Sequence, residues 1–182
     1  MAYLLRVLNI LMLFGLGIVL CSAHGINLIL DIDHLKLAVP YFIYTIFTQA
    51  FIMFYFIGVS KFTNNIWNIL NSKNNLKDLF VNPPSDLNPY VEKTKKFVMK
   101  SNLCKRQTIP WTMLILILGT GAFLLGGAHD TNLVDKYIHS GVAYGFTAAT
   151  IIGFFRQWIY LGKSHHLLRK IKSLFMLADS QM

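Results

Sequence analysis

The chain has 182 residues, of which 54% are hydrophobic and 14% are charged, and its formal net charge is +9. A soluble domain carries about a quarter charged residues, so this composition excludes an ordinary water-soluble domain. The basic residues lie beside long apolar runs, which favours a membrane surface over nucleic acid as their partner. We therefore expect an all-α integral membrane protein that binds no nucleic acid.

Four apolar runs are long enough to cross a bilayer, which takes about 20 residues per helix. They cover residues 4–23, 37–59, 109–127 and 134–161. The first run resembles a secretory signal peptide, because Arg6 precedes an apolar core that ends in small residues. Its Ala-His ending recurs after the third run, where no signal peptide can lie. We therefore interpret the first run as a retained transmembrane helix.

One stretch of sequence occurs twice. The matches at an offset of 105 positions pair Ala23, His24, Asn27, Leu28, His34 and Ala38 with Ala128, His129, Asn132, Leu133, His139 and Ala143. Each copy lies between two apolar runs, so the repeating unit is a hairpin of two membrane helices. We predict two tandem repeats in the same orientation, related by an axis along the membrane normal.

The basic residues are distributed unequally between the two ends of these runs. The two hairpin loops hold only Lys36 and Lys136, whereas the segment between the hairpins and the tail hold most of the remaining lysines and arginines. Basic residues mark the cytoplasmic side of a membrane protein. We therefore predict that both termini are cytoplasmic and that the hairpin loops face outward, in a bacterial inner membrane.

Residues 61–108 are polar and are interrupted by three prolines between positions 83 and 89. Apolar residues within 66–70 and 90–103 predict short amphipathic helices on the inner membrane surface, and the tail after residue 161 has a similar pattern. The lysines of this segment are expected to bind anionic lipid headgroups. The predicted divisions are repeat 1 (residues 1–72), a basic cytoplasmic linker (73–108) and repeat 2 (109–182), each repeat being a hairpin with an interfacial helix.

Parallel repeats place equivalent residues at equal depth, so histidines from both copies should gather at the outer mouth of the bundle. The expected site residues are His24, His34, His129 and His139, with Asp31, Asp130 and Asp135 close by. Histidine next to a membrane helix is uncommon and often functional.

Three interpretations of this cluster remain open. In the first, the histidines bind haem b, because imidazole is a strong axial ligand and the glycines around Gly126 leave room for a porphyrin. In the second, Asp31, Asp130 and Asp135 join the histidines in binding a transition metal such as zinc or copper. In the third, the same side chains cap helix ends and tie the hairpins together.

The sequence contains no nucleotide-binding glycine loop, no Cys-x-x-Cys pair and no nucleophile motif. Charged residues that would line an ion path are also lacking within the apolar runs, and for Gln49 we expect an interhelical hydrogen bond. We therefore predict an accessory or anchor subunit of a larger membrane complex, itself not a complete enzyme. Its partners would be lipids, other membrane subunits or further copies of the chain. The alternative is a haem-binding or metal-binding protein of electron transfer or metal handling.

Overall fold

The computed structural model describes residues 1–26, 33–72, 76–80, 84, 86–131 and 133–175. Within these ranges the chain forms α1 (Ala2–Ala23), α2 (His34–Ser72), α3 (Asn88–Asp130) and α4 (Lys136–Phe175), with a single 3₁₀ turn at Leu76–Asp78. Each of the four α-helices is long and apolar enough to cross a membrane. The prediction of an all-α chain with four membrane-length helices is therefore confirmed.

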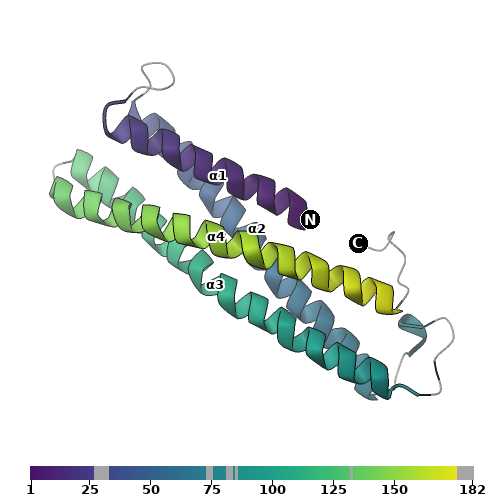
Figure 1. Ribbon diagram of the computed structural model, residues 1–182. Coiled ribbons are helices and arrows are strands. Elements are labelled where there is room, and N and C mark those ends of the chain that lie inside the picture. Colours follow the sequence, from purple (N-terminus) through teal and green to yellow (C-terminus); the bar gives the residue numbers. More distant parts are fainter. Residues whose placement is uncertain (27–32, 73–75, 81–83, 85, 132, 176–182) are drawn as a thin grey trace.

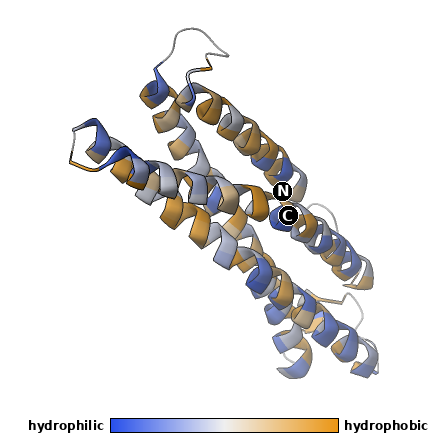
Figure 2. Ribbon diagram, turned by 60° about the vertical axis from the view of Figure 1, so that its left-hand side comes forward, coloured by the Kyte–Doolittle hydropathy of each residue, from blue (hydrophilic) through white to orange (hydrophobic). Residues whose placement is uncertain are grey.

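The helices form an antiparallel bundle in which α1 and α3 each pack between α2 and α4 (Figure 1). We call the end at which α1 and α3 finish, and α2 and α4 begin, the histidine end. The opposite end, which holds the connection between α2 and α3, is called the basic end. Figure 2 shows hydrophobic residues along the half of the bundle that contains α1, and hydrophilic residues gathered near both ends.

The helices differ in length. α1 has 22 residues, whereas α2, α3 and α4 have 39, 43 and 40 residues. At a rise of 1.5 Å per residue, α1 is about 33 Å long and the other three are roughly 60 Å long. The amino terminus therefore lies beside the middle of the bundle (Figure 1). Beyond it α2, α3 and α4 continue as a three-helix stalk, formed by residues 59–72, 88–101 and 164–175.

The stalk corrects the prediction of amphipathic helices lying on the inner membrane surface. Residues 66–70 and 90–103 are continuous parts of α2 and α3, and the tail is a continuous part of α4. Their apolar side chains face one another in the stalk core, which contains Ile66, Leu70, Leu79, Leu167, Ile171 and Phe175. On each long helix, these residues continue the face that is buried in the membrane-length part of the bundle. That face therefore stays buried along the stalk as well. The predicted boundary at residue 108 accordingly falls inside α3.

The buried positions follow the spacing of a coiled coil, in which they are alternately three and four residues apart. In α1 they are Ala2, Leu5, Asn9, Met12 and Leu16. A series in α2 comprises Thr45, Gln49, Ile52, Phe56, Val59, Thr63, Ile66 and Leu70. Large apolar side chains such as Phe47, Phe51 and Phe54 lie outside this series and are more than half exposed. The bundle thus presents apolar side chains outward and keeps several polar ones inside.

Candidate functional site

Histidines from both hairpins line one pocket at the histidine end of the bundle. The pocket has a volume of about 510 Å³, and all four helices contribute to its walls. It is lined by His24, His34, His129 and His139, together with Asp33 and Asp130. The structure therefore brings the four histidines of the two sequence repeats to the walls of one pocket.

Small residues form much of the pocket wall, as expected for α3. They include Gly119, Ala122, Gly126 and Gly127 of α3, and Ala143 of α4. A methyl group added at Gly126 would lie 3.1 Å from Cε1 of His139. That distance is shorter than an ordinary van der Waals contact, so a glycine at this position allows the His139 ring to lie against α3.

The exposed His24 ring contacts groups of α1 and α4. Its Nδ1 lies 2.9 Å from the Leu20 carbonyl oxygen, and its Nε2 lies 3.2 Å from the Tyr144 hydroxyl. A carbonyl only accepts, so Nδ1 donates to Leu20 and the neutral ring accepts from Tyr144 through Nε2. Both nitrogens of His24 are therefore engaged within the protein.

His129 and His139 face the same part of the pocket from α3 and α4. Their ring centroids are 6.3 Å apart and their planes differ by 9°. Nδ1 of His129 donates to the Val134 carbonyl oxygen over 3.2 Å. This bond places the proton on Nδ1 and leaves the Nε2 lone pair of the neutral ring available. Nδ1 of His139 and Nδ1 of His34 are buried and have no hydrogen-bond partner.

Of the three carboxylates in the metal interpretation, the structure describes Asp130 and Asp135. Asp135 accepts a hydrogen bond from the Tyr137 amide over 2.9 Å, as a capping residue at the start of α4 does. Asp130 lines the pocket, and Asp31 lies outside the described residues. Within the described ranges, no group of three or more His, Cys, Asp or Glu side chains is arranged to hold a metal ion. The metal interpretation therefore finds no support in the described part of the pocket.

A buried polar cluster lies below the pocket, in the middle of the bundle. Nε2 of Gln157 donates to Oε1 of Gln49 over 2.6 Å and also lies 3.2 Å from Oγ1 of Thr112. Nε2 of Gln49 lies 3.2 Å from Sδ of Met12. The interhelical bond expected for Gln49 is thus present, but its partners were missed. The coiled-coil spacing of polar residues within the apolar runs could have identified these partners.

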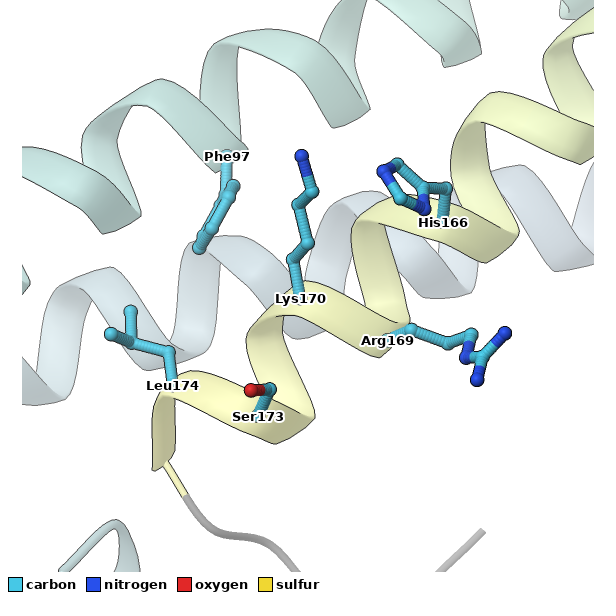
Figure 3. Close-up of a pocket in the computed structure, with 6 residues that line it drawn as sticks. All are labelled: Phe97, His166, Arg169, Lys170, Ser173 and Leu174. Carbon is cyan, nitrogen blue, oxygen red and sulfur yellow. The ribbon is translucent and has the colours of Figure 1, made fainter.

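The stalk carries a second, open groove of about 500 Å³ between α3 and α4. It is lined by Phe97, His166, Arg169, Lys170, Ser173 and Leu174. Figure 3 shows His166 and Lys170 extending on one side of α4 and Arg169 extending on another. Since the cationic groups do not converge on one point, this groove lacks the arrangement of an anion site.

The fold and the site together define a class of protein. It is a bundle of membrane-length helices, with a histidine-lined pocket at one end and polar side chains along its centre. No protein-family model, curated protein or solved structure matches the chain.

Proposed function

We propose that this protein is a haem-binding subunit that carries electrons within a larger membrane complex. The observation that carries the proposal is the pair of buried, unpartnered imidazole nitrogens, on His34 and His139, in a pocket walled partly by glycine. Imidazole is a common axial ligand of haem iron, and a buried nitrogen without a partner is costly unless something binds it. The pocket volume of about 510 Å³ lies within the range of roughly 300–1,000 Å³ for small-molecule and cofactor sites.

The hydrogen bonds of the four histidines divide them into ligand candidates and a supporting residue. Histidines that bind metal usually donate their other ring N–H to a carbonyl or carboxylate, which orients the ring. His129 has this arrangement through the Val134 carbonyl, so we assign it a ligand role together with His34 or His139. We assign His24 the supporting role, because its two ring nitrogens contact the Leu20 carbonyl and the Tyr144 hydroxyl. A bound haem would supply one-electron chemistry, and these residues would hold and orient it.

The placement of basic residues supports an orientation with the pocket outside and both termini in the cytoplasm. The chain lacks the sequence motifs of a nucleotide-dependent or nucleophilic enzyme. On this proposal, one partner protein would deliver electrons to the pocket and another would accept them. The chain would then act as an accessory subunit of a larger complex.

The test is a reduced-minus-oxidised absorption spectrum of the full chain, purified from membranes after expression with added haem, with haem quantified by its pyridine complex. We expect about one haem per chain. His129→Gln should remove most of the absorbance, whereas His24→Gln should keep it. Insertion of each variant is checked by its helical content in detergent. A wild-type protein that contains no haem under these conditions would overturn the proposal.

The second candidate is a non-catalytic anchor subunit in which the histidines tie the hairpins. The bonds from His24 and His129 to main-chain carbonyls favour it, as does the capping of α4 by Asp135. Each such bond contributes about 0.5–1.5 kcal/mol. On this account, His129→Gln lowers the melting temperature and leaves the absorption spectrum without a haem signal in both the variant and the wild type.

A further inference from the structure

The open groove on the stalk combines apolar and cationic side chains. Its two apolar lining residues, Phe97 of α3 and Leu174 of α4, are half-buried. The cations Arg169 and Lys170 line it from α4 and are exposed, as is His166. In Figure 3, Phe97 extends from α3 toward α4, whereas Arg169 and Lys170 extend in different directions. The groove of about 500 Å³ therefore has an apolar floor and cations spread along one edge.

Two further lysines border the groove on α3. Lys93 and Lys100 lie one turn before and one turn after Phe97, so they share its face of the helix, and both are exposed. Within the stalk, which the structure describes throughout, the sequence contains one carboxylate, that of Glu92. Glu92 precedes Phe97 by five residues and lies about 140° around the helix from it. The stalk itself therefore supplies no carboxylate beside the groove.

These charges determine what kind of molecule fits the groove. Like charges on one face repel one another, and carboxylates from another molecule would relieve this repulsion. Lys93 and Lys100 are about 10 Å apart along the helix axis, so one small anion cannot reach both of them. Several carboxylates along a chain can do so. A large apolar side chain on the same chain would cover Phe97 and Leu174.

The height of the groove favours a protein over lipid headgroups. Leu5 of α1 and Leu161 of α4 belong to one buried cluster, so they lie at the same level. From that level α1 continues three residues to Ala2, whereas α4 continues nine residues to Lys170 and thirteen to Leu174. Lys170 and Leu174 therefore lie about 9 and 15 Å beyond the end of α1. The headgroup layer extends only roughly 5–8 Å beyond the hydrocarbon. With the bilayer around α1, the outer half of the groove is in water.

We propose that the stalk groove is the docking site for an acidic segment of a soluble protein, on the side of the membrane that the basic end faces. The segment places one large apolar side chain between Phe97 and Leu174, and its carboxylates meet Lys93, Lys100 and Lys170. The inference is independent of what occupies the histidine-lined pocket, which lies at the other end of the bundle.

The first experiment selects peptides from a displayed library of random dodecapeptides on the full chain in phosphatidylcholine nanodiscs, with empty nanodiscs as competitor. We expect the enriched peptides to be rich in aspartate and glutamate and to share a large apolar residue. A selection that enriches no acidic peptides overturns the proposal.

The second experiment measures the affinity of one enriched peptide, labelled with fluorescein, by anisotropy. The double variant Lys93→Gln and Lys170→Gln should weaken binding about fivefold, because two exposed ion pairs are lost. The matched control is Lys61→Gln with Lys95→Gln, which removes the same charge from exposed positions of the stalk. Lys61 lies on α2, and Lys95 lies about 160° around α3 from Phe97. The control should stay within twofold of the wild type. Equal weakening by both double variants would show a general effect of charge and would overturn the proposal.

The apolar floor is tested on the peptide, so that the protein stays intact. Replacing the large apolar residue of the peptide by serine should weaken binding about tenfold, because burial of that side chain is lost. Unchanged affinity would contradict a docking site with an apolar floor.

Nanodiscs of phosphatidylglycerol distinguish a protein partner from lipid headgroups. Anionic lipid repels an acidic peptide from the two double variants alike, so the ratio of their affinities should persist. A ratio that falls to one in these nanodiscs would show that headgroups occupy the groove in place of the peptide, and would overturn the proposal.

Discussion

The rings of Tyr41 and Phe146 meet across the centre of the bundle, with centroids 6.3 Å apart and planes at 63°. The two residues are 105 positions apart, which is the offset that relates the two histidine stretches. Thr45 and Thr150 share the same offset, and each donates to the carbonyl oxygen four residues earlier. Residues close to a twofold axis contact their own equivalents. The contact therefore supports the proposal that the hairpins are repeats related by an axis along the bundle.

Two glycines lie close against the rings of this contact. A methyl group at Gly15 would lie 3.0 Å from the Tyr41 ring, and one at Gly119 would lie 3.0 Å from the Phe146 ring. Overpacking of this kind costs about 1–3 kcal/mol. We expect Gly15→Ala and Gly119→Ala to lower the melting temperature by similar amounts. Gly17→Ala is the control, because a methyl group there meets nothing within 4 Å. Unchanged melting temperatures in both variants would contradict the close packing of these glycines against the two rings.

The orientation of the bundle is tested by single cysteines in a background of Cys21→Ser and Cys104→Ser. Thr131 and Lys77 are exposed and lie near the histidine end and the basic end, respectively. In intact cells, an impermeant thiol reagent should label Thr131→Cys, and Lys77→Cys should react only after permeabilisation. Labelling of Lys77→Cys from outside would reverse the proposed orientation.

The stalk core predicts that truncating its buried side chains lowers the stability of the protein. Helices lying on a membrane surface would not need these side chains. Leu70 and Ile171 are 1% exposed and belong to the same apolar cluster. Truncation of such side chains to alanine costs about 2–5 kcal/mol. We expect Leu70→Ala and Ile171→Ala to speed hydrogen exchange at residues 66–72 and 167–175, whereas the exposed Asn71→Ala should not. Unchanged exchange in both core variants would contradict the packing of the stalk.

The contact between Gly126 and His139 gives a test of the pocket. A methyl group at position 126 would press on the His139 ring, whereas one at Gly127 would meet nothing within 4 Å. If the pocket holds haem, Gly126→Ala should shift the absorption maximum or lower the haem content at least twofold, and Gly127→Ala should do neither. Identical spectra for Gly126→Ala and the wild type would remove His139 from the ligand candidates and leave His34.

The sequence predicted the helices and the gathering of the histidines because both depend on local patterns. Apolar runs of membrane length are recognised without knowledge of their partners, and the spacing of His24 and His34 recurs as His129 and His139. The engagement of His24 by Tyr144 was not predictable in this way, since it joins residues 120 positions apart.

The stalk and the polar centre were missed for a different reason. An apolar stripe at residues 66–70 fits a membrane surface or a partner helix equally well, and its phase relative to the rest of α2 decides between them. Hydropathy averaged over about 20 residues also conceals single polar residues such as Asn9 and Gln157. Only their spacing relative to neighbouring buried positions marks them as interior.

The short α1 also fixes where a bilayer can lie along the longer helices. Its length of about 33 Å nearly equals the hydrocarbon thickness of about 30 Å, so the bilayer should coincide with α1. The stalk then projects roughly 25 Å into water. A protein fused to Met1 would be held at the headgroups, whereas one bound near Leu70 and Phe175 would sit well clear of the lipid. The same chain therefore offers two attachment heights on one side of the membrane.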